Sequence, residues 1–194
     1  MRIYPLLAAS AKSPSHTMLG TAFAVSPEWL CTTSNVAPDE RSWQDILAYD
    51  AVANAPLSLL EVRERWPLTF VRVRSQSRAD ANAFSSGTDE VQAHALRLRG
   101  FYGSEPLFTR CTLHGRIVCE HDRTTPPRLQ VDFPMLPGFC GAPLLDNIGD
   151  VAGVLFDNRN VLLDDKPAAH ALAYPARIIA ARLNQAGLRV PSPV

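Results

Sequence analysis

The stretch from Pro137 to Asp146 reads Pro-Gly-Phe-Cys-Gly-Ala-Pro-Leu-Leu-Asp, and it decides more about this 194-residue chain than any other segment. Gly138 lies two residues before Cys140 and Gly141 directly after it, so the backbone can turn sharply around the thiol with little side-chain crowding. Such a turn can direct two backbone N–H groups at one point, as an oxyanion hole requires. The stretch therefore indicates a nucleophile loop centred on Cys140.

The composition of the chain is that of a globular protein with no electrostatic preference for polyanions. Hydrophobic residues make up 46% and charged residues 20%, which argues against disorder. The formal net charge is zero, so we expect neither nucleic acid nor an acidic membrane surface as a partner. Sixteen prolines against ten glycines predict many turns and sheet edges, which favours an all-β protein.

The N-terminus and the cysteines bear on the compartment. Residues 1–11 weakly imitate a signal peptide, but Pro5 interrupts a short apolar run, which predicts a first strand instead. The four cysteines form no CxxC pair, and this pattern predicts a cytoplasmic protein. If Cys111 and Cys119 share one strand, they lie roughly 26 Å apart and cannot form a disulfide.

Short apolar runs bounded by turn residues predict a succession of strands and two lobes. Residues 74–89 are polar and unpatterned and indicate a linker, so we expect a lobe over 1–80 and another over 81–175 within one domain, 1–194. The predicted strands cover 2–9, 20–25, 29–33, 45–52, 57–62, 68–73, 91–98, 107–118, 128–132, 143–145, 151–156 and 169–173.

Only the end of the chain has a helical pattern. From Pro175 onward, Ala176, Ile179 and Leu183 repeat at a spacing of three to four residues. Pro175 suits a helix start and Gly187 suits its stop, so we expect a helix over 176–187.

Three segments in the same order resemble the chymotrypsin-like (trypsin-fold) proteases, most closely the bacterial HtrA-type branch without its peptide-binding appendage. Residues 20–36 read GTAFAVSPEWLCTTSNV, similar to the family's GSGFVISP…WVLTAAHV. Residues 98–103 with 115–118 weakly resemble the family's GYP…GIV. Residues 130–154 keep the family's spacing from Asp132 to the nucleophile and its Gly-x-Val-x-Gly strand. The resemblance implies an all-β, chymotrypsin-like double β-barrel with a short C-terminal helix.

The same comparison shows where this chain departs from the family. Asn35, or Val36 if the alignment slips by one, stands at the position of the catalytic histidine, and neither accepts a proton at neutral pH. The strand that begins with the catalytic aspartate in the family reads Trp66-Pro67-Leu-Thr-Phe here. With an ordinary pKa of about 8.5, only a few per cent of Cys140 would be thiolate at pH 7. We therefore expect a degenerate triad.

The resemblance also implies where the remaining site residues lie. The backbone amides of Gly138 and Cys140 would form the oxyanion hole. Phe156, Asn158 and His170 would line the pocket for a substrate side chain. We expect His16 to lie in a loop before the second strand. We interpret this residue and three further histidines as surface or hydrogen-bonded groups, namely His94, His114 and His121. Cys31 is most simply a core residue, and the sequence shows no spacing typical of a metal site, so we expect no metal and no cofactor.

Two functions from different classes follow. The first is a protease-like protein without efficient peptidase activity, whose cleft holds a peptide or a partner's strand by β-addition and which regulates or scaffolds an intracellular assembly. The second is a cysteine peptidase or self-processing domain with Cys140 as nucleophile, because cysteine depends least on an adjacent base. Nucleic-acid binding ranks third, since Arg72 and Arg74, like Arg97 and Arg99, are short alternations on strands rather than a dense basic cluster.

Overall fold

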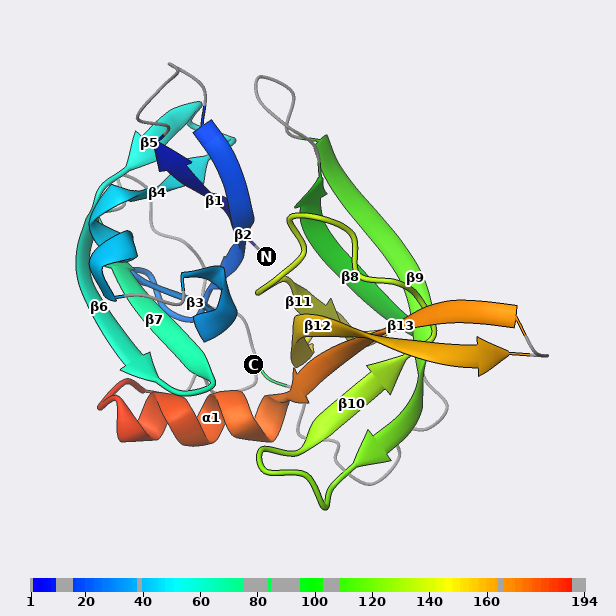
Figure 1. The fold of residues 1–194 in the computed structure, drawn as a ribbon. Helices are drawn as coiled ribbons and strands as arrows, with labels where there is room; N and C mark the ends of the chain where they lie inside the picture. The colour runs from blue at the N-terminus through cyan, green and yellow to red at the C-terminus, as the bar shows by residue number, and fades with distance from the viewer. Residues whose placement is uncertain are drawn as a thin grey trace.

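The first lobe of the computed structural model is a seven-stranded antiparallel sheet. The structure describes residues 2–9, 16–37, 40–74, 84, 95–102, 109–163 and 166–189. The sheet has the order β5-β4-β1-β2-β3-β7-β6 and curls into a half-open barrel (Figure 1). Its elements are β1 (Ile3–Ala9), β2 (His16–Ala24), β3 (Trp29–Thr33), the 3₁₀ helices η1 (Ser34–Val36) and η2 (Glu40–Asp45), β4 (Ile46–Asp50), β5 (Ala55–Leu57), β6 (Leu59–Arg65) and β7 (Leu68–Val73).

The second lobe is a closed barrel with the strand order β10-β13-β12-β11-β8-β9. Its strands are β8 (Ala95–Tyr102), β9 (Thr109–His121), β10 (Arg128–Val131), β11 (Pro143–Leu145), β12 (Val151–Leu163) and β13 (Lys166–Pro175), and the helix α1 (Ala176–Gln185) follows. The predicted all-β double barrel with a short C-terminal helix is confirmed. No helix of the described chain combines the length and the apolar character needed to cross a membrane.

The strands that face both lobes are buried on both sides. Leu68 and Phe70 of β7 pack into a cluster between the lobes, whereas Val71 and Val73 pack into the core of the first lobe. Because side chains alternate across a strand, the apolar residues of β7 contribute to two cores at once. The second barrel is filled by a third cluster that includes Phe139 of the nucleophile loop.

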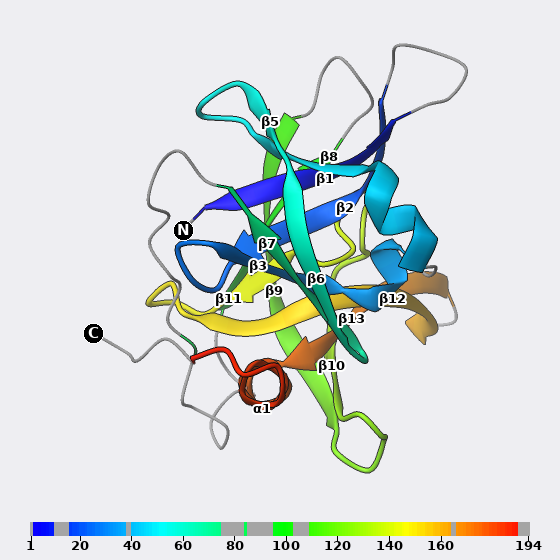
Figure 2. The same cartoon turned by 90° about the vertical axis from the view of Figure 1, so that its left-hand side faces the viewer.

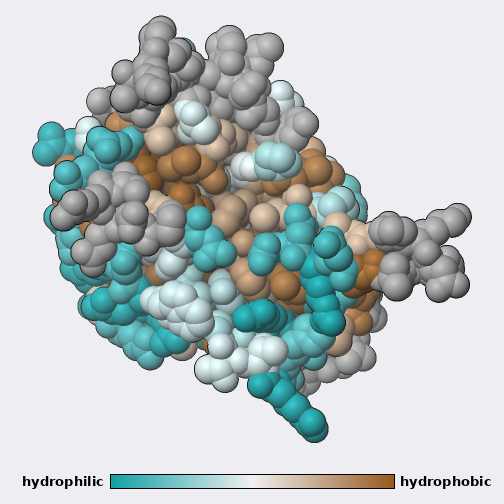
Figure 3. Space-filling model, in the orientation of Figure 1, coloured by the Kyte–Doolittle hydropathy of each residue, from teal (hydrophilic) through white to brown (hydrophobic). Residues whose placement is uncertain are grey.

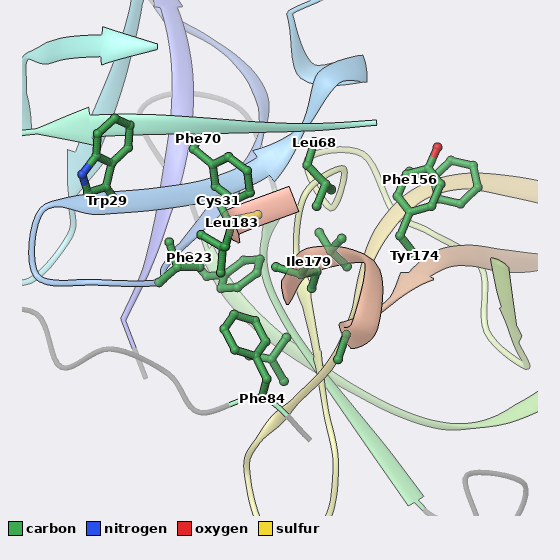
Figure 4. Close-up of a cluster of buried hydrophobic side chains, with 14 of the residues drawn as sticks. Phe23, Trp29, Cys31, Leu68, Phe70, Phe84, Phe156, Tyr174, Ile179 and Leu183 are labelled. Atoms are coloured by element: carbon green, nitrogen blue, oxygen red, sulfur yellow. The ribbon is translucent and has the colours of Figure 1, made fainter. Parts of the chain in front are cut away.

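Helix α1 closes the bottom of the cluster between the lobes. Ile179 and Leu183 point into the same group of side chains as Phe70 and Cys31 (Figure 4). Figure 2, which looks along the helix, shows it lying beneath strands of both lobes. Gly187 has a φ of +69° directly after the helix, which is the backbone conformation that favours glycine at a helix end. The predicted helix and its stop are therefore confirmed, and so is the core position of Cys31.

Two local predictions need correction, and a third lies mostly outside the described residues. His16 lies on β2 rather than in a loop, because β2 pairs with β1 as far as Ala9. Strand β12 runs seven residues beyond the predicted end at Phe156, pairing with β13 throughout. The polar residues after Phe156 hid this hairpin, since backbone pairing needs no apolar side chain where a hairpin projects into solvent. Most of the expected linker 74–89 lies outside the described residues, but Phe84 within it is buried and bridges to Val151.

Replacing Leu183 with alanine tests the role of α1 in holding the lobes. The side chain is wholly buried, so Leu183→Ala should lower the free energy of unfolding by about 2–5 kcal/mol. The neighbouring Asn184 is exposed and supplies the control, because Asn184→Ala should change the free energy of unfolding by less than about 0.5 kcal/mol. Urea unfolding measures both values, and equal effects would show that α1 does not pack as described.

Candidate functional site

The nucleophile loop consists of two successive β-turns. The Phe139 N–H donates to the Leu136 carbonyl at 3.0 Å, and the Ala142 N–H donates to the Phe139 carbonyl at 2.9 Å. Gly138 occupies the third position of the first turn, with a φ of +89°, and Gly141 occupies the third position of the second turn, with a φ of +81°. A positive φ at that position is typical of a type II turn and favours glycine. The two glycines of the motif are therefore required by the backbone path around Cys140.

The nucleophile loop belongs to the second lobe but is hydrogen-bonded to the first lobe. The Thr21 N–H donates to the Cys140 carbonyl, and the Thr21 hydroxyl donates to the Gly138 carbonyl, both at 2.8 Å. A Cβ placed on Gly141 would overlap Thr32 Oγ1 and the Thr21 carbonyl oxygen. The loop thus sits directly against β2 and β3, at the crevice between the lobes.

The Cys140 thiol faces oxygen atoms. Its Sγ lies 3.1 Å from Thr33 Oγ1 and 3.8 Å from the Phe156 carbonyl oxygen. Burial raises the pKa of the Cys140 thiol, the Thr33 hydrogen bond works against that rise, and the Asp157 carboxylate adds to it. Desolvation and a nearby carboxylate both favour the protonated form of this half-buried thiol, which is the less nucleophilic form.

The positions expected for the base and the carboxylate hold amide and hydroxyl groups. Asn35 is exposed on η1, and its Nδ2 donates to the Phe156 carbonyl at 3.3 Å. Next to it, Ser34 Oγ lies 3.3 Å from Thr69 Oγ1, which links η1 to the start of β7. Amides and hydroxyls do not accept a proton at neutral pH. The Phe156 carbonyl oxygen thus contacts both Asn35 and Cys140.

The described imidazoles lie away from the thiol. His121 and His170 are hydrogen-bonded to Gln130, and His114 is exposed on β9. None of these three hydrogen-bonds to Cys140 Sγ; His94 and the side chain of His16 lie outside what the structure describes. In the same described part of the chain, no three His, Cys, Asp or Glu side chains gather as a metal site requires.

Two amides of the loop are available for an oxyanion. Within the described residues, neither the Gly138 N–H nor the Cys140 N–H donates a hydrogen bond to another group. These are the two amides that the sequence predicts for the oxyanion hole. The loop therefore retains donors that have no internal acceptor, although the groups that would activate the thiol are absent from its contacts.

The predicted pocket residues occupy three different environments. Phe156 is buried and stacks on Tyr174 with ring centroids 4.0 Å apart, as Figure 4 shows. Asn158 joins β12 to Met135, just before the nucleophile loop, because its Oδ1 accepts from the Met135 N–H at 2.6 Å and its Nδ2 donates to the Met135 carbonyl at 3.1 Å. His170 is buried, and its Nδ1 accepts from Gln130 Nε2 at 2.8 Å. Their roles in binding a substrate stay predictions.

The surface around the site is partly apolar. Figure 3 views the face that carries η1 and the nucleophile loop, and apolar residues gather across its middle, between the two lobes. Polar residues border this area below. A contiguous apolar area with a polar rim is typical of a binding surface.

Sequence reasoning missed the hydroxyl groups of the site. Thr33 and Ser34 stand where the family pattern quoted above has two alanines, and Thr69 lies across from Ser34 on β7. The signal was present as two hydroxyls in place of two methyl groups. Their contacts could be recognised only once β3, β7 and the loop lay side by side.

The two barrels and the crevice loop define a protein of the chymotrypsin-like peptidase fold. A family model described as the trypsin-like peptidase domain matches residues 20–154, and the chain belongs to this family. The expected family is therefore confirmed, whereas the degenerate triad stays a prediction. No curated protein sequence matches the chain.

Solved structures agree on the fold. The active form of the Rv3671c protease from M. tuberculosis has a TM-score of 0.69 at 17% identity, over 99% of this chain and 82% of that one. An inactive form of Rv3671c has a TM-score of 0.67 at 18% identity, and the match covers 95% of this chain and 88% of that one. The serine endoprotease from Yersinia pestis has a TM-score of 0.68 at 13% identity, and the match covers 95% of this chain but 61% of that one.

Alanine at Gly141 tests the fit of the loop against the first lobe. Gly149 is a matched control, since its φ is +100° but a Cβ there would meet no atom closer than Arg97 Nη2 at 3.8 Å. Gly149→Ala should cost about 1–2 kcal/mol of unfolding free energy from backbone strain alone. Gly141→Ala should cost a further 1–3 kcal/mol or so, because the methyl group overlaps Thr21 and Thr32. Equal losses in urea unfolding would contradict the close approach.

Proposed function

We propose that this trypsin-fold protein does not hydrolyse peptide bonds efficiently and that its cleft binds an extended peptide or a strand of a partner protein. The observation that carries the proposal is the contact of Cys140 Sγ with Thr33 Oγ1 at 3.1 Å, in the place where a peptidase needs a base. Cytoplasmic residence and a role in regulating or scaffolding an intracellular assembly belong to the same proposal.

The chemistry of the thiol supports the loss of activity. A peptidase thiol is activated by a base or by a lowered pKa, but burial and Asp157 raise the pKa of Cys140. Losing members of a triad typically costs on the order of 10⁴–10⁶ in rate. Asn35 Nδ2 is a hydrogen-bond donor directed at the Phe156 carbonyl, so this side chain serves structure rather than proton transfer.

The edge of β12 supports peptide binding. Strand β12 pairs with β11 only from Val151 to Val154, whereas its pairing with β13 continues to Leu163. One edge of the residues after Phe156 therefore has no strand partner in the described part of the chain. An extended peptide can add to such an edge through backbone hydrogen bonds. The apolar area in the middle of Figure 3 would receive its side chains.

Side chains already occupy part of that edge. Asp157 Oδ1 accepts from the Asn158 N–H at 2.8 Å, and the Asn158 side chain holds Met135. An incoming peptide must replace the Asp157 contact to use the Asn158 amide. Asp157 therefore limits the affinity of the cleft in this proposal.

A second candidate function is a cysteine peptidase or self-processing domain with Cys140 as nucleophile. The observation that favours it is that the Gly138 and Cys140 amides have no acceptor among the described residues and can stabilise a tetrahedral oxyanion. This function would require a base from outside the described contacts, supplied by the substrate or by a partner.

Labelling of Cys140 separates the two functions. A tetrapeptide chloromethyl ketone should label Cys140 more slowly than it labels free cysteine at pH 7.5, because the raised pKa lowers the thiolate fraction. The rate should increase with pH, with a midpoint above that of free cysteine, because the thiol loses its proton only at higher pH. Mass spectrometry of the labelled peptide provides the rates, and the protein should not cleave casein.

Variants at Asn35 give the control. Asn35→His places an imidazole on η1 and should raise the labelling rate at pH 7.5 by about tenfold or more, whereas Asn35→Gln should leave it unchanged. Rapid labelling of the unmodified protein that Cys140→Ala abolishes, together with cleavage of casein, would replace the first function by the second.

Hydrogen exchange tests peptide binding. An alkylated tryptic digest of casein supplies extended peptides of many sequences, and its addition should slow amide exchange between Asp157 and Asn160. Asp157→Ala should strengthen this protection, because the Asn158 N–H then lacks its internal acceptor. Asp122→Ala, on the β9–β10 connection, is the control and should leave the protection unchanged. Unchanged exchange in both the unmodified protein and Asp157→Ala would exclude β-addition at this edge.

A further inference from the structure

A chain of hydrogen-bonded side chains lies on the outer face of the second barrel. Cys119 Sγ on β9 is 3.9 Å from Nδ1 of His121, and His121 Nε2 is 3.2 Å from Oε1 of Gln130 on β10. Gln130 Nε2 in turn donates to Nδ1 of the buried His170 on β13 at 2.8 Å. A thiol and an imidazole on β9 are thus followed by a group on the adjacent strand β10 that orients the imidazole, and β13 on the other side of β10 carries His170.

Strand alternation separates this chain from the barrel core. Leu129 and Val131 on either side of Gln130 point into the barrel, so Gln130 points outward. Cys119 pairs directly with Gln130 across the two strands, and His121 is two residues further on the same face. Cys119 is exposed to solvent, whereas Gln130 is buried.

Arg159 decides how the hydrogen atoms are arranged. Its Nη1 lies 3.5 Å from the side-chain oxygen of Gln130, and a guanidinium offers only donors. The oxygen of Gln130 therefore faces Arg159 and His121, and its nitrogen faces His170. Because this oxygen can only accept and lies 3.2 Å from His121 Nε2, a neutral His121 carries its hydrogen on Nε2. Arg159 Nη1 also lies 3.4 Å from Nε2, and with a hydrogen already there it donates to the Gln130 oxygen instead. The Nδ1 lone pair of His121 is left to face the thiol of Cys119.

We propose that Cys119 and His121 form a second thiol site, independent of the peptide cleft, that exchanges with small disulfides of the glutathione type. A nucleophile beside a base that a third group orients is the arrangement that activates thiols in proteins. Arg159 supplies a cation next to the site for a carboxylate of such a ligand. The separation of 3.9 Å between sulfur and nitrogen leaves room for closer approach when the disulfide binds.

The exchange step balances without a further reagent. His121 Nδ1 takes the thiol proton, and the Cys119 thiolate attacks one sulfur of the disulfide. The disulfide bond of the ligand breaks as a new one forms between Cys119 and one half of the ligand. The other half leaves as a thiolate and takes the proton back from His121. The protein thiol is oxidised, and half of the ligand is reduced.

The other cysteines lack this arrangement. Cys111 lies on the same strand and is half-buried, with no imidazole among its described contacts. Cys31 is wholly buried, and burial raises its pKa. Cys140 contacts Thr33 and Phe156. Strand β9 extends past its predicted end at Val118 and carries both Cys111 and Cys119, so these two thiols are too far apart to form a disulfide and Cys119 exchanges with a ligand instead.

Reaction with oxidised glutathione tests the site in the full-length protein. At pH 6.5 Cys119 should form the mixed disulfide about tenfold or more faster than Cys111. The reason is that the neighbouring imidazole removes the proton from the Cys119 thiol, whereas Cys111 reacts only through its small thiolate fraction. Mass mapping of both cysteines over time gives the two rates. His121→Gln should bring the rate of Cys119 down to that of Cys111 at pH 6.5.

Two further measurements keep the result decisive. His114→Gln removes an exposed histidine from the same strand and should leave the rate of Cys119 unchanged. In the unmodified protein, the rate of Cys119 should depend less on pH between 6 and 8 than the rate of Cys111. Equal rates and equal pH profiles for the two thiols would overturn the proposal, as would an unchanged rate at Cys119 in folded His121→Gln.

Discussion

The two hydrogen bonds from Thr21 to the carbonyls of Gly138 and Cys140 are the contacts on which the site depends. They join a turn of the second lobe to a central strand of the first, so they place the thiol at the crevice. They also require glycine at 141 and at 20, because a Cβ on Gly20 would lie 2.6 Å from the Cys140 carbonyl oxygen. The backbone of the site is therefore specified by steric fit rather than by the groups that perform chemistry.

Amide and hydroxyl groups contribute to the packing beside the nucleophile loop. The 3₁₀ turn that carries Asn35 is attached through the Asn35 and Ser34 side chains and through the Ser34 N–H, which donates to the Pro67 carbonyl at 3.0 Å. An amide and two hydroxyls satisfy the buried polar groups there without any charge to desolvate. The Cys140 thiol lies beside oxygen atoms of Thr33 and Phe156, and burial raises its pKa. Packing and reactivity are thus decided by different atoms of the same few residues.

Local signals predicted much of the fold. The glycine pattern around Cys140 predicted its turns, and the apolar spacing after Pro175 predicted α1 within two residues of its end. The long β12–β13 hairpin escaped prediction because exposed strands need no apolar periodicity. The sequence did not predict the contacts of Thr33 and Thr69, or the series of hydrogen-bonded side chains from Cys119 to His170. Their partners depend on the register between strands, which the sequence of one strand does not encode.

The sequence by itself determined the class of fold, the centre of the site and the absence of an imidazole at position 35, because each depends on residue type at a local position. Only the tertiary structure decided what surrounds Cys140, that Asn158 joins β12 to Met135 just before the nucleophile loop, and that His121 faces Cys119 rather than Cys140. Those relations join residues up to 107 positions apart. They arise from strand pairing and the packing of two lobes, and such distances between side chains are properties of the folded chain alone.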